Sequence, residues 1–239
     1  MDKGSVTQRA PQGGLQRIYR NLPNIVSILG VLPLSFLLLE DGFSYLPALI
    51  VYNNFVDDLD GILARELRLS SDFGARLDNV ADGVSHILIA FVVGAHYGGL
   101  VLAFSAVAAA AILIRVGQRL NPSAVYGSGT PTNELMRHLL LLVLLQDAFD
   151  FDITVFLASV YLLNAVSMLV PFAMPHLVRA KTKTVVSILL VNVALVVAWA
   201  LPAASPFIAA LFFGTYLYSF SVGGVSWLRN GRPTRAHVL

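Results

Sequence analysis

Eight apolar runs, separated by short connections that carry most of the charge, make up the greater part of this 239-residue chain. About 20 apolar residues in a helix cross a bilayer core, and a backbone in lipid must satisfy its hydrogen bonds within its own segment. The pattern therefore predicts an all-α fold, a polytopic membrane helical bundle. The expected helices span 24–39, 45–67, 77–96, 100–116, 133–145, 153–170, 185–201 and 206–227.

Composition supports the membrane class independently. The mean hydropathy is +0.73, 56% of the residues are hydrophobic and 13% are charged, whereas about 25% are charged in an average soluble domain. Cysteine is absent, which removes disulfides, thiolate metal sites and cysteine nucleophiles. The polar segment 1–16 has no apolar core and does not resemble a cleavable signal. The run at 133–145 is short for a full span, so a tilted helix or one continuous with a neighbour is expected there.

The charged connections divide by sign. If the N-terminus is cytoplasmic, all 16 Lys and Arg residues fall on the cytoplasmic side, and the opposite connections carry only acidic residues. This distribution obeys the positive-inside rule. It predicts a multi-pass protein of the cell (inner) membrane, and it explains the formal net charge of +2 without nucleic-acid binding.

Residues 57–82, DDLDGILARELRLSSDFGARLDNVAD, form an acidic block on the predicted cytoplasmic side. Asp57 and Asp60 lie on one face of a helix, as do Asp78 and Asp82, so two adjacent helices can bring the four together. Clustered carboxylates at the edge of a bilayer are tolerated around a polyvalent cation. Oxygen-only ligation predicts two divalent cations, Mg²⁺ or Mn²⁺, which would clamp a diphosphate during an in-line displacement. Asp58 and Glu66 are expected to be bystanders.

The spacing Asp-x2-Asp-Gly-x2-Ala-Arg, then eight residues, then Gly-x3-Asp-x3-Asp closely resembles the signature of the CDP-alcohol phosphatidyltransferase family. Every signature position is filled, by Asp57, Asp60, Gly61, Ala64, Arg65, Gly74, Asp78 and Asp82. The resemblance implies a six-helix core, here residues 22–180, followed by additional transmembrane helices at 181–228. Residues 1–21 would be a cytoplasmic tail with an interfacial helix at 15–20, and 229–239 a cytoplasmic tail.

The resemblance also implies the reaction and its residues. A phosphatidyl group would pass from a CDP-linked lipid, CDP-diacylglycerol, to the hydroxyl of a small polar alcohol, with release of CMP. By resemblance, Asp57, Asp60 and Asp78 hold one metal ion. Asp57, Asp78 and Asp82 hold the second, and Asp82 is also the general base. The segment PNIVS at 23–27 resembles the family's Pro-Asn-x-x-Thr/Ser element. Positions that match CDP-lipid contacts are Asn24, Ile25, Val26, Ser27, Gly61, Ala64, Arg65, Ser71 and Gly74. A homodimer is implied as well.

The run LDNVADGVSH at 77–86 bears on the acceptor. It lacks the basic residue that members using glycerol phosphate carry after the last aspartate, and it resembles the corresponding run of bacterial and archaeal phosphatidylserine synthases. L-Serine is therefore the expected acceptor, with glycerol 3-phosphate, inositol phosphate and choline as alternatives. Candidate acceptor contacts are His86, Arg115, Arg119 and Arg137. Membrane anchoring explains the arginines equally well, and helix packing explains His86.

Two other classes use similar residues. Membrane prenyltransferases bind diphosphate through aspartate motifs, but these normally lie in separate halves of the chain, whereas here both fall within 57–82. A transporter or channel with intramembrane carboxylates is the non-enzyme alternative, although no inverted repeat or second charged cluster appears in the later helices. The remaining histidines show no ligand spacing, so no zinc site is expected.

Overall fold

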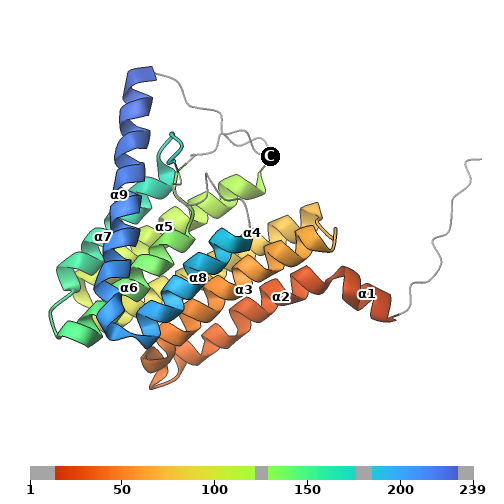
Figure 1. The fold of residues 1–239 in the computed structure, drawn as a ribbon, viewed down its shortest axis with the longest axis horizontal. Coiled ribbons are helices and arrows are strands. Elements are labelled where there is room, and N and C mark those ends of the chain that lie inside the picture. Colours follow the sequence, from red (N-terminus) through yellow and green to blue (C-terminus); the bar gives the residue numbers. More distant parts are fainter. Residues whose placement is uncertain (1–13, 122–128, 176–184, 231–239) are drawn as a thin grey trace, which may run out of the picture.

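The structure is a computed structural model that describes residues 14–121, 129–175 and 185–230 (Figure 1). All regular secondary structure in this part of the chain is helical, and it contains no strand, as predicted. The elements are α1 (Gly14–Arg20), α2 (Leu22–Val31), η1 (Leu32–Leu38), η2 (Gly42–Tyr45), α3 (Leu46–Glu66), α4 (Asp72–Tyr97), α5 (Gly99–Leu120), α6 (Asn133–Phe149), α7 (Thr154–Leu169), α8 (Val185–Ala200), η3 (Pro202–Ala204) and α9 (Ser205–Asn230).

Each predicted helix has a counterpart; α5, α6 and α9 extend three or four residues beyond the predicted C-terminal ends, and two larger differences concern the run at 24–39 and the start of α4. The run at 24–39 divides into α2 and the 3₁₀ helix η1, because Pro33 has no backbone N–H to continue the α-helical hydrogen bonds. Helix α4 begins at Asp72, earlier than the predicted residue 77. Its start is fixed by Ser71, whose hydroxyl accepts a hydrogen bond of 3.0 Å from the backbone N–H of Gly74.

Helix α6 occupies the centre of the bundle and is a separate helix. Every residue from Leu135 to Leu144 is buried, and the helix packs against α3, α4, α7, α8 and α9. A helix that is apolar on all sides is typical of such a central position. The unbroken apolar run HLLLLVLL is thus explained by the packing of other helices against every face of α6.

Three helical segments of the described chain are long and apolar enough to cross a membrane, namely Asp72–Tyr97, Gly99–Leu120 and Pro202–Arg229. Gly14–Arg20 and Leu22–Leu38, which are bent by 64° from each other, add a fourth candidate when the two are taken together as one span, while α7 and α8 are apolar but shorter. The six-helix core with two added helices therefore remains a prediction. Its boundary at 180/181, the predicted cytoplasmic cations Arg179, Lys181 and Lys183, and the tails at 1–13 and 231–239 lie outside the described residues.

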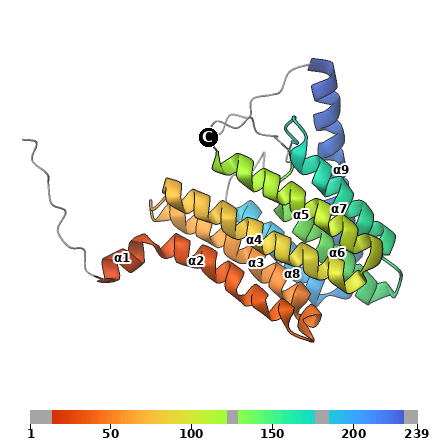
Figure 2. The same cartoon turned by 180° about the vertical axis from the view of Figure 1, so that it is seen from behind.

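One end of the bundle collects the beginning of α2, the end of α3 and the beginning of α4 (Figures 1 and 2). The chain turns back between α3 and α4, so the two halves of the acidic block become neighbours. At the opposite end of α4, Phe43 of η2 stacks on His96 with ring centroids 3.5 Å apart. This end carries Asp41, and the site end carries Arg65 and Arg76, which agrees with the predicted division of charge.

The position of α4, which carries two of the acidic residues, depends on close packing against α5 at Gly94. A Cβ atom at Gly94 would lie 2.6 Å from Cβ of Ser105, whereas a Cβ at Gly214 in α9 would meet nothing within 4 Å. We expect Gly94→Ala to lower the midpoint temperature of thermal unfolding of the purified protein in detergent. Gly214→Ala should leave it unchanged or raise it, since alanine favours a helix by about 1 kcal/mol over glycine. Ser105→Gly in the Gly94→Ala background should restore part of the loss. Equal midpoints for the two alanine variants would contradict this account of the α4–α5 contact.

Candidate active site

Three carboxylates from two helices converge at this end of the bundle. Asp57 and Asp60 of α3 and Asp78 of α4 each offer an oxygen, and these oxygens lie within 4.8 Å of one another. Asp60 is buried, and the other two are half-buried. A set of carboxylate oxygens alone suits a hard divalent cation, so the residues present fit such an ion.

Asp82 lies one turn beyond Asp78 on α4 and faces the same space. It lines a small cavity together with Asp57, Asp60 and Asp78, and its carboxyl contacts that of Asp57. The structure thus brings all four predicted aspartates together, with Asp82 deeper along α4 than the cluster of three.

The connection between α3 and α4 explains the fixed gap in the sequence signature. The backbone N–H of Leu69 donates to the carbonyl of Ala64 over 2.9 Å, and Arg68 adopts a left-handed conformation with φ of 53°. These features end α3, and the Ser71 cap begins α4 three residues later.

Helix α2 contributes to the site through Ser27. Its hydroxyl donates a hydrogen bond to Asp60 and lies 3.2 Å from the carbonyl of Pro23. Asn24 and Ser27 are three positions apart and share one face of α2. The PNIVS segment therefore contacts the carboxylate cluster through Ser27, and its predicted role in CDP-lipid binding stays a prediction.

A cavity of about 180 Å³ lies beside the cluster, between the beginnings of α2 and α4 and the end of α3. It gathers most of the predicted CDP-lipid contacts, namely Asn24, Ser27, Gly61, Ala64, Arg65, Ser71 and Gly74. Ile25 and Val26 do not line it, and Ile25 is exposed on the outside of α2. Successive helical residues point about 100° apart, so the two residues between Asn24 and Ser27 face elsewhere.

Two glycines keep the walls of this cavity close together. A Cβ at Gly74 would lie 3.0 Å from Oδ1 of Asn24 and 3.1 Å from Oγ of Ser71. A Cβ at Gly61 would lie 3.3 Å from a guanidinium nitrogen of Arg65, which folds back over the glycine. The cavity thus combines a guanidinium with the first turns of two helices, where backbone N–H groups and helix dipoles favour an anion.

The predicted acceptor contacts lie outside the lining of these two cavities. His86 is buried, with Nδ1 2.8 Å from the Thr132 hydroxyl. Arg115 donates to the carbonyl of Gly129 over 3.0 Å.

The other two arginines also have protein partners. Arg119 donates to Oδ1 of Asn79, the neighbour of Asp78, over 3.1 Å. Arg137 is buried, pairs with Glu134 at 2.9 Å and donates to Oδ1 of Asn54 over 3.0 Å. A role for any of the four in acceptor binding stays a prediction.

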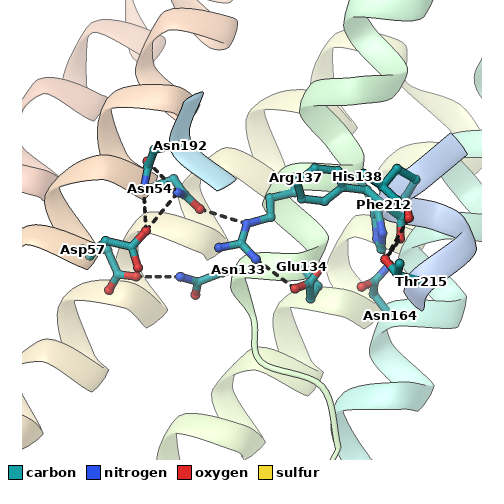
Figure 3. Close-up of polar contacts among 12 residues, drawn as sticks. Asn54, Asp57, Asn133, Glu134, Arg137, His138, Asn164, Asn192, Phe212 and Thr215 are labelled. Carbon is teal, nitrogen blue, oxygen red and sulfur yellow. Dashed lines mark hydrogen bonds and ion pairs between the residues drawn. The ribbon is translucent and has the colours of Figure 1, made fainter. Parts of the chain in front are cut away.

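A buried polar network continues from the carboxylates into α6 and α8, and sequence reasoning missed it (Figure 3). Asn133 at the start of α6 donates to Asp57 over 2.6 Å. Asn192 of α8 donates to Asp58 over 2.8 Å, and Asn54 bonds Asp58, Asn192 and Arg137. Asp58, which was expected to be a bystander, lies outside the cluster of three carboxylates, but its side chain is buried and hydrogen-bonded in this network. The available signal was an asparagine within the apolar run 185–201, since such a residue normally faces the bundle interior.

Ser85 is a second missed residue. Its side chain is fully buried and lines the carboxylate cavity, and its hydroxyl has no hydrogen-bond partner among the described residues. It follows Asp82 by three positions, so the same helical face that carries Asp78 and Asp82 predicts its place.

The chain matches the CDP-alcohol phosphatidyltransferase family over residues 20–216. It belongs to this family. The matched range contains the carboxylates, the cavity beside them, α8 and the first half of α9. A protein of Aquifex aeolicus (strain VF5) that carries the description "Uncharacterized protein" is 29% identical over 133 residues, which cover 52% of this chain and 68% of the relative.

Family membership, together with the apolar helices, makes the chain an integral membrane enzyme of phospholipid biosynthesis. As a CDP-alcohol phosphatidyltransferase it transfers a phosphatidyl group from a CDP-alcohol to an alcohol and uses divalent metal. The interpretations as a prenyltransferase or a transporter lose their support.

The bond from Asn133 to Asp57 is expected to hold that carboxylate in its ligating orientation. Loss of a side chain that orients a metal ligand typically lowers metal affinity about 10- to 100-fold. We therefore expect Asn133→Ala to weaken Mn²⁺ binding, measured by electron paramagnetic resonance, by about tenfold or more. Asn79→Ala is the matched control, because Asn79 bonds Arg119 and the Ala75 carbonyl. Equal Mn²⁺ affinity in wild type and Asn133→Ala would show that Asp57 needs no such support.

Proposed function

We propose that this enzyme transfers the phosphatidyl group of CDP-diacylglycerol to the hydroxyl of L-serine, with two Mg²⁺ or Mn²⁺ ions, and releases CMP. The observation that carries the proposal is the convergence of Asp57, Asp60 and Asp78 within 4.8 Å, directly beside the cavity that the signature residues line. The active site would face the cytoplasm from the inner membrane, and the enzyme would act as a homodimer.

The cavity beside the carboxylates suits the CDP end of the donor. Arg65 and the first turns of α2 and α4 present positive charge and backbone N–H groups to a diphosphate. Gly61 and Gly74 let the nucleotide approach the backbone closely. Asn24 and Ser71 supply polar groups at the rim of the same cavity.

The four aspartates divide into two ligand sets that share two members. Asp57, Asp60 and Asp78 would hold one ion, and Asp57, Asp78 and Asp82 the other. Divalent ions bound there would neutralise the diphosphate and the departing CMP. Ser27 and Asn133 keep Asp60 and Asp57 oriented by direct hydrogen bonds.

Asp82 is the proposed general base. It lines the carboxylate cavity and contacts Asp57. From this place it would take the proton from the attacking hydroxyl, while the other side chains position the reactants. These residues require no covalent protein intermediate.

Serine is proposed as the acceptor because the run LDNVADGVS lacks a basic residue directly after Asp82. The test is purified enzyme in nanodiscs with CDP-diacylglycerol and, separately, serine, glycerol 3-phosphate, inositol phosphate or choline, scored by CMP release and lipid product. We expect serine to give the highest turnover, chelation to abolish it, and Mg²⁺ or Mn²⁺ to restore it. Robust transfer to another alcohol with none to serine would refute the assigned acceptor. Full turnover in excess chelator, with carry-over excluded, would refute the metal mechanism.

Substitution of Asp57 and Asp82 by asparagine separates their roles. Asp57→Asn removes a ligand shared by both ions and should weaken CDP-diacylglycerol binding at saturating Mg²⁺ as well as turnover. Asp82→Asn should mainly lower kcat, because loss of a general base costs about 10² to 10⁴ in rate. Asp72→Asn is the control, since Asp72 is an exposed acid at the start of α4 outside the cluster. Near-normal turnover in Asp82→Asn, or loss of donor binding as complete as in Asp57→Asn, would rule out Asp82 as the base.

A further inference from the structure

A second and larger cavity, of about 290 Å³, lies between α6, α8 and α9 and reaches Asp58 on α3. This volume is at the lower end of the range of small-molecule sites, about 300–1,000 Å³. The cavity shares no lining residue with the cavity beside the carboxylates. None of the signature residues lines it, so the proposed donor site does not account for it.

The deep end of this cavity is polar and buried. Thr130, Ser187 and Arg137 line it there with exposed fractions of 1%, 4% and 4%, alongside the carboxylates of Asp58 and Glu134. Arg137 is already engaged by Glu134 and Asn54 (Figure 3). This end therefore offers hydroxyl, carboxylate and guanidinium groups within a small space.

The mouth of the cavity is apolar and open. Leu190 of α8 and Leu211 of α9 line it with exposed fractions of 62% and 60%, and both belong to strongly apolar helices. In an integral membrane protein such exposed leucines face hydrocarbon. Val191, Ala194 and Phe212 continue the apolar wall inward. A molecule entering here comes sideways from the bilayer and places its polar end inside.

We propose that this cavity binds a single-chain lipid amphiphile with a hydroxyl-bearing head. The head lies against Thr130, Arg137 and the neighbouring carboxylates, and the hydrocarbon chain leaves between α8 and α9. A head with hydroxyl groups both donates and accepts hydrogen bonds, which suits this mixture of groups. A phosphate monoester in the same place would face the carboxylates of Asp58 and Glu134 and be repelled by them.

The proposed binding site lies next to the carboxylate cluster and is linked to it through intermediate side chains. Asp58 and Arg137 line the cavity and both bond Asn54, while Asn133, one helical turn before Arg137 on α6, bonds Asp57. A bound head group thus lies against the side chains that surround the carboxylates. The inference goes beyond the proposed reaction and does not depend on serine being the acceptor.

The test compares two probes with the same chain, monooleoylglycerol and oleoyl lysophosphatidic acid, titrated into the full-length protein in detergent and followed by native mass spectrometry. We expect saturable binding of one monooleoylglycerol, with affinity about tenfold or more above that for the phosphate lipid, which corresponds to about 1.4 kcal/mol. Absence of saturable binding, or equal affinity for the two probes, would overturn the proposal.

Matched variants locate the site. Ala194→Phe fills the inner wall of the cavity, whereas Val193→Phe adds the same ring at an adjacent, exposed position of α8 that does not line it. We expect the first variant to lose about tenfold or more in monooleoylglycerol affinity and the second to match wild type. Leu211→Trp and Leu217→Trp repeat the comparison on α9 at two exposed positions, of which only Leu211 lines the cavity, so the result does not depend on a variant that folds poorly. Equal affinities within both pairs would place the lipid elsewhere. CMP release, measured in parallel, keeps this outcome separate from that of the proposed reaction.

Discussion

The carboxylates at the end of α3 repel one another, and hydrogen bonds from the surrounding helices compensate this repulsion. Carboxylates that are close together and half out of water resist ionisation unless donors or cations compensate them. Three acidic residues within one turn of α3 are each bonded by a different helix: Asp57 by Asn133 of α6, Asp58 by Asn192 of α8 and Asp60 by Ser27 of α2. Because helical side chains point about 100° apart, these residues reach neighbours in different directions. Helix α3 is thus the element around which the site end of the bundle is arranged.

The sequence predicted the parts of this arrangement that depend on spacing within one helix. The spacing of Asp57 to Asp60 and of Asp78 to Asp82 determines which side chains share a face, and the structure brings all four together. The helices themselves were also predictable, because long apolar runs permit few alternatives. Ile25 and Val26 were predicted as CDP-lipid contacts only because they lie within the PNIVS motif. Helical geometry places both outside the cavity that Asn24 and Ser27 line.

Contacts between helices were not predictable in the same way. Periodicity says which face of α8 carries Asn192, but it does not say that α3 lies opposite, so its bond to Asp58 became visible only in the structure. The same holds for Asn133, which lies 76 positions from Asp57 in the sequence. Composition gave a weaker signal, namely that a polar residue in an apolar run needs a partner inside the bundle. That signal identifies the polar residue but does not predict which residue it bonds.

The two cavities lie on different sides of α3, and this geometry bears on how effects of substitution should be interpreted. The cavity beside the carboxylates lies towards α2 and α4, and the second cavity lies towards α6, α8 and α9. Removing one partner of a buried carboxylate costs more than the hydrogen bond itself, because the other partner is left desolvated and unpaired. A change at Asn192 or Arg137 therefore disturbs Asp58 and Asn54, which lie next to the carboxylate cluster on α3, without any contact with substrate. Loss of turnover in such variants is the expected consequence of a disturbed α3, and only a direct binding measurement separates it from loss of a ligand contact.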